Sequence, residues 1–531
     1  MKRSLPGLGL LAALLIVPFA LRPPALADDP DAKKLSVLTP HNDAIRYEIT
    51  RGFKRYLAQH GGRKVRIDWR SPGGTTEISR YLASEYRSSF EAFWRTREGR
   101  PLSEAGARAF ANPKQSLEGD SEPARARRTF LQSSVGVRID VLFGGGSYDF
   151  SQHAAAGRLV DAGLLQKHPE LFGEHAIPQT VGGEPYWDKQ GRWYGVCVSG
   201  FGICYNRIAL ERLGIEQVPS RWADLADPRL QGHLALADPS KSGSANKAFE
   251  MIVQQQMAEA VERHGRPAAG SPQEHAALAE GFEAGLRLIR RLGASARYFT
   301  DQASKVTQDV QSGAAAAGMC IDFYGRFESD EGGAASRLAF ALPIGGTSMG
   351  SDPIGLLRGA PQPELGKALI EFTLTPEGQQ LWAYKRGVPG GPERYALRRL
   401  PILPSLYRPE VTALRSDPHD NPYRTAHEFT YHAGWTGPLF RALSFVIRVM
   451  CVDSEVELHD AARALTEHGR PPRAQALFDD MSLLSYRVVK GEIAPALSSG
   501  DPLREVAIQN QLVSAIKAQY EQVAELARGG K

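Results

Sequence analysis

The sequence predicts an α/β protein followed by a helical C-terminal region. Near the start, a β-rich run at residues 34–39 leads through a turn into a helix with apolar residues on one face. A second buried-strand pattern, at residues 137–143, runs directly into three glycines. After about residue 408 strand signals vanish and helical patterns dominate, so residues 408–531 are expected to form a helical extension of a strand-and-helix protein.

The N-terminus has the pattern of a secretory signal peptide. Lys2 and Arg3 are basic, residues 8–21 form a short apolar stretch, and Ala25-Leu26-Ala27 has the small residues that a signal peptidase accepts. We expect cleavage after Ala27 and a soluble, periplasmic mature protein. No later segment approaches the apolar run that a membrane-spanning helix needs.

Composition favours a multidomain globular protein and argues against nucleic-acid binding. The 531 residues are 42% hydrophobic, which is enough for two or three domains. The net charge of +5 is spread along the chain without a basic stripe and interleaved aromatic residues. The cysteines match no metal framework and are expected to be buried apolar residues, although one disulfide stays open; they are Cys197, Cys204, Cys320 and Cys451.

Two middle segments suggest how the domains are arranged. Residues 83–128, with Phe90, Phe93 and Trp94 at helical spacing, predict an amphipathic helical insertion. Residues 193–206 predict extended chain that crosses from one lobe to another, with glycines that allow close backbone approach.

A serine-rich helix start is the first candidate binding feature. Asp238-Pro239 ends a predicted strand, and Ser242, Gly243 and Ser244 open a long helix. Hydroxyls and unpaired backbone amides at a helix N-terminus favour an anion. The alternative is that a serine here only caps the helix.

Two further features follow predicted strands. Gly144, Gly145 and Gly146 leave room for a ligand and Ser147 adds a hydroxyl, although a plain turn explains the pattern equally well and no helix start is evident after it. Near residue 322, strand alternation would place Asp322 and Tyr324 on one side, with Arg326 close by; an ordinary surface position is the alternative.

One motif requires an enzyme hypothesis to be considered. Residues 346–350 fit the G-x-S-x-G pattern of serine hydrolases, with Ser348 as the nucleophile. That motif needs a helix immediately after the serine, whereas Ser351-Asp352-Pro353 predicts a loop. We therefore expect no catalytic residue, and an exported hydrolase that uses Ser348 stays the alternative. We also expect no cofactor and no metal.

From residue 34 to residue 407 the sequence resembles the periplasmic solute-binding proteins of bacterial ABC importers with the type II fold, in the branch of ferric-iron, thiamine, sugar-phosphate and phosphonate receptors. The resemblance implies two α/β lobes with a ligand between them, and permease subunits in the membrane as partners. It implies lobe 1 at residues 28–195 and 327–407 and lobe 2 at 196–326. The segments that carry the resemblance are LSVLTPHNDAIRYEITRGFKRY, IDVLFGGGS, YGVCVSGFGICYNRIAL, ADPSKSGSANKAF, VTQDVQSGAAAAGMCIDFYGR and TLTPEGQQLW.

The resemblance leaves the ligand open between an anionic organic solute and ferric iron. His41 fits the histidine of ferric receptors, but glycines stand at the acidic position and Asp322-Phe323 stands where a tyrosine pair would be. A phosphate, phosphonate or carboxylate group suits the serine and glycine loops better, with His41 and Arg326 adding positive charge. The expected ligand-binding residues are His41, Asn42, Gly145, Gly146, Ser147, Ser242, Gly243, Ser244, Asp322, Tyr324 and Arg326.

Overall fold

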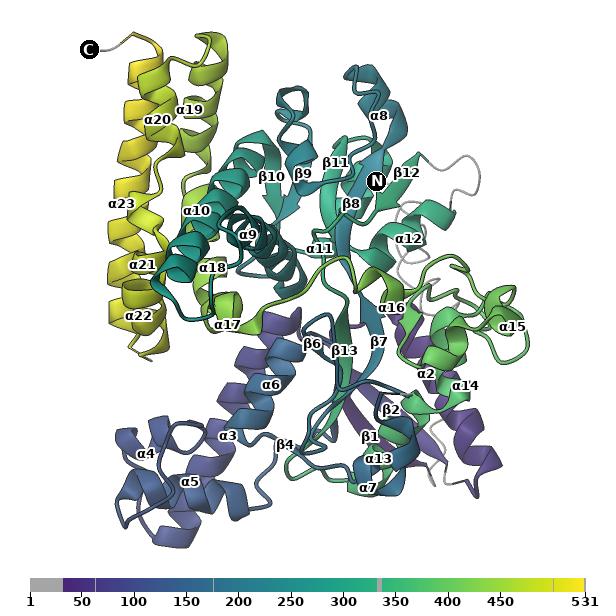
Figure 1. The fold of residues 1–531 in the computed structure, drawn as a ribbon. Helices are drawn as coiled ribbons and strands as arrows, with labels where there is room; N and C mark the ends of the chain where they lie inside the picture. Colours follow the sequence, from purple (N-terminus) through teal and green to yellow (C-terminus); the bar gives the residue numbers. More distant parts are fainter. Residues whose placement is uncertain (1–31, 63, 175, 332–336, 500, 530–531) are drawn as a thin grey trace, which may run out of the picture.

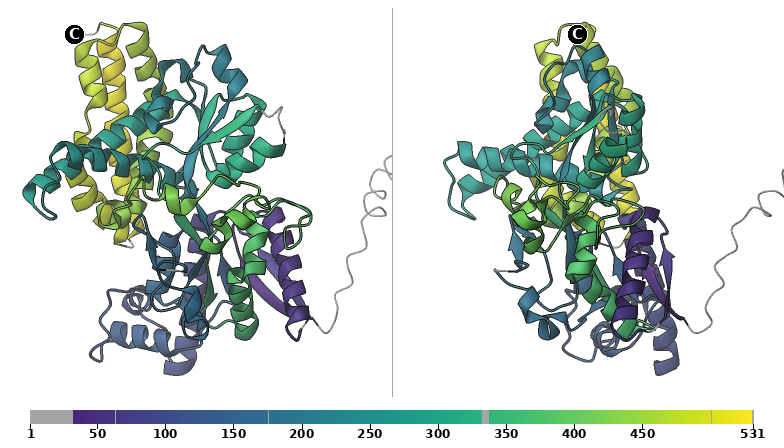
Figure 2. Two further views of the ribbon diagram at one scale, coloured as in Figure 1. Left: turned by 45° about the vertical axis from the view of Figure 1, so that its right-hand side comes forward. Right: turned by 90° about the vertical axis from the view of Figure 1, so that its right-hand side faces the viewer.

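The computed structural model describes residues 32–529 apart from residues 63, 175, 332–336 and 500, so the predicted signal peptide, residues 1–27, lies outside the described residues. The described chain forms two sheets with helices around each, and a bundle of helices at the C-terminal end (Figure 1). We call the part built on each sheet the first and the second lobe. In Figure 2 the first lobe lies below, and the second lobe and the C-terminal helices lie above.

The first lobe contains a seven-stranded mixed sheet. Strand β1 pairs in parallel with β2 and β3, whereas β13 runs antiparallel to both β3 and β7. The strands lie in the order β14 (Leu400–Pro401), β7 (Tyr194–Ser199), β13 (Gly350–Leu357), β3 (Val141–Phe143), β1 (Lys33–Leu38) and β2 (Val65–Arg70), with β4 (Leu159–Val160) beside β13.

The second lobe repeats this arrangement with five strands. Strand β9 pairs in parallel with β10 and β11, and β8 runs antiparallel to β11. In both lobes the first of three parallel strands lies in the middle, so the strand order reverses direction between the first and the third strand. The order is β10 (Ala296–Thr300), β9 (Leu234–Ala237), β11 (Ala317–Ile321), β8 (Phe201–Asn206) and β12 (Leu338–Ala341).

The chain crosses from the first sheet to the second within the predicted segment 193–206, because β7 ends at Ser199 and β8 begins at Phe201. It returns between β12 and β13. The expected boundaries at residues 195 and 327 therefore differ from the structure, since β7 extends to Ser199 and β12 still belongs to the second sheet. An apolar alternation marks a strand, but it does not show which sheet the strand joins.

Helices cover the sheet of the first lobe and also form the predicted insertion. Helix α3 begins at Thr75, directly after β2, so the excursion starts as a continuation of the sheet's own helix. Its Phe90 and Trp94 are buried, and Arg127 donates to the carbonyl oxygens of Ala155 and Ala156 at the end of α6. The helices are α2 (Asp43–Gln59), α3 (Thr75–Glu98), α4 (Glu104–Ala109), α5 (Glu122–Gln132), α6 (Ser147–Ala156), α7 (Leu164–Lys167), α13 (Pro363–Leu374) and α14 (Pro376–Ala383).

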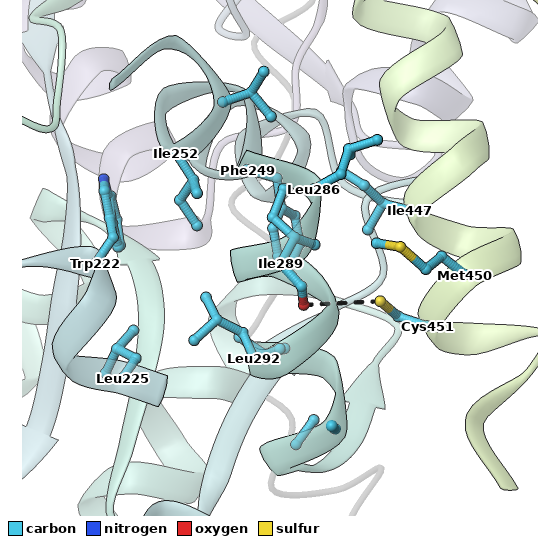
Figure 3. Close-up of a cluster of buried hydrophobic side chains, with 14 of the residues drawn as sticks. Trp222, Leu225, Phe249, Ile252, Leu286, Ile289, Leu292, Ile447, Met450 and Cys451 are labelled. Carbon is cyan, nitrogen blue, oxygen red and sulfur yellow. Dashed lines mark hydrogen bonds between the residues drawn. The ribbon is translucent and has the colours of Figure 1, made fainter. Parts of the chain in front are cut away.

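The C-terminal extension is helical, as predicted, and packs on the second lobe. Figure 3 shows Ile447 and Met450 facing Leu286 and Ile289 of α10, and Cys451 donates to the carbonyl oxygen of Ile289. The second-lobe helices are α8 (Arg207–Arg212), α9 (Gly243–Arg263), α10 (Pro272–Ser295), α11 (Ala303–Ser312) and α12 (Asp322–Glu331). The extension has α15 (Pro409–Thr412), α16 (Pro422–Thr425), α17 (Ala433–Thr436), α18 (Phe440–Ile447), α19 (Glu455–Glu467), α20 (Pro472–Asp479), α21 (Tyr486–Val488), α22 (Ala494–Ser498) and α23 (Pro502–Ala527).

One extension segment corrects the expectation that no later stretch is long and apolar enough to span a membrane. The helical stretch Ala433–Val452 passes that test by length and composition. Half of it is buried, and Leu443, Val446 and Ile447 belong to the core shared with α9 and α10. We therefore assign it as a core helix of the second lobe.

The four cysteines are buried, as predicted, and all four are free thiols. The disulfide that the sequence left open is therefore not formed in this structure. Burial raises the pKa of the Cys451 thiol to about 12, so this thiol packs as a neutral apolar group.

The packing of the extension predicts a large loss of stability when Ile447 is truncated. Ile447 is fully buried, so Ile447→Ala leaves a cavity and should lower the free energy of unfolding by about 2–5 kcal/mol. Urea denaturation measures the change. The matched control is Val456→Ala in α19, because Val456 is 77% exposed and its truncation removes little packing. Equal losses in the two variants would contradict this packing.

Candidate functional site

The loops that follow four parallel strands form the candidate site. In an open α/β sheet, ligands bind beyond the carboxyl ends of the strands where the strand order reverses. In the first lobe these ends are β1, which leads to His41, and β3, which leads to Gly144. In the second lobe they are β9, which leads to Asp238, and β11, which leads to Asp322. All the predicted site residues lie in these loops or in the first turn or two of the helices that follow them.

Three helix N-termini from both lobes meet at Thr75, the first residue of α3. A Cβ atom built on Gly145, just before α6, would lie 3.3 Å from Thr75 Cγ2. A Cβ on Gly243, the first residue of α9, would collide with Thr75 Oγ1, and one on Gly74 would lie 3.2 Å from the carbonyl oxygen of Lys241. The glycine loop of the first lobe and the serine loop of the second lobe therefore contact the same side chain.

A helix follows the glycine loop directly, which the sequence analysis did not predict. Helix α6 begins at Ser147 itself, with Gly146 as its N-cap, whereas no helix start was evident there from the residue pattern. Gly144 has φ +91°, and a Cβ on it would lie 2.6 Å from His41 Nε2. Only glycine fits there because the imidazole occupies the space that a side chain would need.

Two of the three helices begin without a side-chain cap. Helices α3 and α6 have glycine N-caps, at Gly74 and Gly146, which supply no side-chain oxygen to the first amides. At α9 the predicted capping alternative holds, because Ser242 Oγ accepts from Ala245 N–H and lies 3.1 Å from Ser244 Oγ. Asn42 likewise caps α2 by accepting from Ile45 N–H.

A half-buried carboxyl group lies beside the meeting point of the helices. Asp149, in the first turn of α6, has Oδ2 3.8 Å from where a Cβ on Gly243 would be. Burial raises the pKa of Asp149 to about 7, and a hydrogen bond with Ser79 only partly offsets it. The carboxyl group is therefore close to half protonated at neutral pH.

The donors predicted to bind an anion at His41 and Gly145 are taken by a carboxylate of the protein itself. Asp352, in β13, accepts from Gly145 N–H at 2.7 Å and lies 3.1 Å from His41 Nε2. Arg399, just before β14, pairs with the same carboxylate and donates to Ser199 Oγ at 3.0 Å. Sequence analysis assigned no binding role to Asp352, which it treated only as part of a loop after the serine motif, and it did not single out Arg399.

The His41–Asp352–Arg399 cluster stays charged although it is buried. Burial opposes ionisation of Asp352, but Arg399 and His41 outweigh it and hold its pKa far below the usual range. Burial lowers the pKa of His41 in spite of Asp352. The Arg399 guanidinium lies 4.3 Å from the ring centre of Phe323, so a cation of the first lobe contacts an aromatic ring of the second.

The predicted strand geometry at Asp322 is wrong. Strand β11 ends at Ile321 and Asp322 begins α12, so Asp322 and Arg326 lie one helical turn apart and form a buried ion pair at 2.7 Å. Arg326 Nε also contacts Asp420 of the extension at 3.0 Å, so its charge is already compensated. Burial raises the pKa of Tyr324, with Arg399 acting in the opposite direction.

The geometry around Ser348 is not that of a hydrolase nucleophile. Ser348 Oγ donates to Glu184 Oε1 at 2.6 Å rather than to a histidine. The chain after it enters strand β13 instead of the helix that a nucleophile elbow requires.

Across the described part of the chain no group of three or more His, Cys, Asp or Glu side chains could hold a metal ion. The oxygen and nitrogen donors nearest the candidate site are already bound to one another, as at His41 and Asp352.

The Asp352 cluster predicts a strong, pH-dependent stabilisation. Asp352→Ala leaves the Arg399 guanidinium buried without its carboxylate and should cost about 3–5 kcal/mol of unfolding free energy at pH 7. Because the folded pKa of Asp352 is lowered, its contribution is complete above the unfolded pKa, near 4, and is lost as pH falls further.

Denaturation of wild type and variant between pH 3 and pH 8 measures this difference. It should be constant from pH 5 to pH 8 and shrink toward pH 3. The control is Glu364→Gln, which removes a surface carboxylate paired with Lys367 and should change little. A difference that stays the same down to pH 3 would contradict the assigned ion pair.

Comparisons with known proteins agree with this architecture. Residues 138–402 match the family model described as bacterial extracellular solute-binding protein. A Haemophilus influenzae protein is 26% identical over 250 residues, or 47% of this chain and 62% of the relative, and a Salmonella typhimurium phosphoglycerate transport regulatory protein is 25% identical over 189 residues, or 35% and 40%. The chain thus spans less than two thirds of the length of these relatives.

Two solved structures have low identity and modest superposition. The substrate-binding protein of an Agrobacterium tumefaciens ABC transporter is 15% identical, with a TM-score of 0.48 over 80% of this chain and 97% of its own. Iron-bound HitA from Pseudomonas aeruginosa is 14% identical, with a TM-score of 0.46 over 78% and 99%. With the family match over residues 138–402 and the repeated two-sheet topology, this chain belongs to the bacterial extracellular solute-binding proteins and has the type II periplasmic binding fold.

Proposed function

We propose that the protein is the extracytoplasmic receptor of an ABC importer and that it binds an anionic organic solute between its two lobes. One observation carries the proposal: the N-termini of α3, α6 and α9 meet at Thr75 from both lobes, and two of them lack a side-chain cap. Each N-terminus presents unpaired amides and the positive end of a helix dipole. An anion there would satisfy amides of both lobes at once.

Binding at this point favours closure. The helices α3 and α6 belong to the first lobe and α9 belongs to the second, so an anion between them interacts with all three only when the lobes are close. A ligand shifts a conformational equilibrium by its differential affinity for the two states. The predicted export signal and the permease partners complete this proposal, because a receptor of this kind works outside the cytoplasm.

A solute with two acidic groups fits the site better than a simple inorganic anion. One group would lie at the helix N-termini. Arg399 is next to this point through Gly145 and Asp352. Within the described chain nothing accepts from its buried Nε, which leaves this donor for a second acidic group. The name of the Salmonella relative suggests phosphoglycerate, which carries a phosphate and a carboxylate, as the first solute to test.

The proposal predicts that a negative charge at the α6 N-cap weakens binding. A side chain fits at Gly146, since no atom of the described residues lies within 4 Å of a Cβ built there, and both Asp and Asn are good N-caps. Gly146→Asp places a carboxylate where the solute's anionic group would lie and should weaken 3-phosphoglycerate binding at least tenfold.

The control is Gly146→Asn, which caps the helix without charge and should weaken binding much less. Isothermal titration calorimetry measures both variants, after a thermal-shift comparison of 3-phosphoglycerate, inorganic phosphate, a dicarboxylate, thiamine and ferric citrate with the wild type. Stabilisation by the ferric salt or thiamine alone, or equal affinities of the two variants for the anion, would overturn the anionic ligand class.

The carboxyl group of Asp149 predicts a pH dependence of the same binding. With a pKa of about 7, Asp149 is mostly neutral at pH 6 and mostly charged at pH 8, where it would repel an anion. Affinity should fall several-fold from pH 6 to pH 8 in the wild type relative to Asp149→Asn. Taking the ratio of the two proteins removes the titration of the solute itself; a ratio that does not change with pH would exclude this role for Asp149.

A further inference from the structure

A segment of the C-terminal extension lies across both lobes. The chain leaves the first lobe after β14 and reaches the second-lobe core at α18. In Figure 1 this stretch passes between the two lobes on its way to α17 and α18. It is a third connection in addition to the two crossings at residues 199–201 and 341–350. We call residues 426–440 the strap.

The strap is bonded to a hairpin of the first lobe, formed by β5 (Thr180–Val181) and β6 (Glu184–Pro185). Tyr431 N–H donates to the carbonyl oxygen of Gly182 at 2.8 Å. The next residue, Gly183, has φ +81°, and a Cβ on it would collide with the carbonyl oxygen of Tyr431. The hairpin turn is therefore shaped to fit against the strap.

A buried charge network joins the same hairpin to α9 and the strap. Lys247 Nζ of α9 lies 2.9 Å from Glu184 of the hairpin and 2.9 Å from Glu250 of α9, and 3.5 Å from the ring centre of Tyr431. Tyr431 Oη donates to Glu250 at 2.9 Å, and Thr436 Oγ1 donates to the same oxygen at 2.5 Å. First lobe, second lobe and strap thus share one network.

A second contact lies at the start of α6, beside the candidate solute site. The ring centre of Phe440 is 4.6 Å from that of Tyr148 in the first lobe. The carbonyl oxygen of Phe440 accepts from Asn246 Nδ2 of α9 at 2.9 Å. The strap therefore contacts both lobes at two points, Tyr431 and Phe440.

We propose that the strap holds the two lobes closed in the absence of solute, through Gly182 and Gly183 on one lobe and the Lys247–Glu250 network on the other. Separating the lobes would break the Glu184–Lys247 ion pair and detach the hairpin from Tyr431. The consequence of this closed state for solute exchange rests on the proposed function. Solute would enter after a rare detachment of the hairpin from the strap.

Small-angle X-ray scattering of the solute-free full chain tests this proposal. The wild type should scatter as the closed structure does. Gly183→Ala should drive the hairpin off the strap and increase the radius of gyration. The matched control is Gly99→Ala, because Gly99 has φ +66° and no atom within 4 Å of a Cβ built on it, so it carries the same backbone strain without touching the strap.

A second variant keeps the test decisive if Gly183→Ala fails to fold. Glu184→Gln removes the interlobe ion pair but leaves Lys247 paired with Glu250, and it should also open the solute-free protein. A wild type that is open without solute, or folded Gly183→Ala and Glu184→Gln variants that scatter as the wild type does, would overturn the proposal. No solute is present in this measurement, so its outcome is independent of the ligand class.

Discussion

The structure depends on the direction of the helices that follow parallel strands. Each such helix begins at the carboxyl edge of its sheet, so its unpaired amides and its positive dipole end lie at that edge. The second sheet repeats the strand order of the first, and the crossings at residues 199–201 and 341–350 bring the two edges together. The meeting of α3, α6 and α9 at Thr75 follows from this arrangement.

A carboxylate of the protein itself, that of Asp352, lies inside the candidate site. Asp352 binds the Gly145 amide, His41 Nε2 and the Arg399 guanidinium, so these three groups have an anionic partner without a solute. A buried guanidinium needs a carboxylate nearby, since an unpaired charge costs several kcal/mol. The free amides of α3 and α6 are what this internal ion pair leaves for a solute.

The C-terminal extension is part of the second lobe's core rather than an appended domain. Most of its buried apolar residues share one cluster with α9 and α10, and its strap reaches the β5–β6 hairpin of the first lobe. Large buried contact between segments distant in sequence usually fixes their relative position. The extension therefore connects the apolar core of the second lobe to the β5–β6 hairpin of the first lobe.

Local patterns in the sequence determined the order of strands and helices, the helical extension, and the glycine and serine loops at the strand ends. The export signal stays a prediction. These patterns failed for residues whose contacts or secondary structure depend on a partner far along the chain. Asp352 contacts His41, which lies 311 positions earlier in the chain. Strand β11 ends at Ile321, where it pairs with Phe201 of β8, and Asp322 therefore begins a helix. Short-range periodicity cannot encode such pairings, since they arise only when two sheets bring distant strand ends to the same edge.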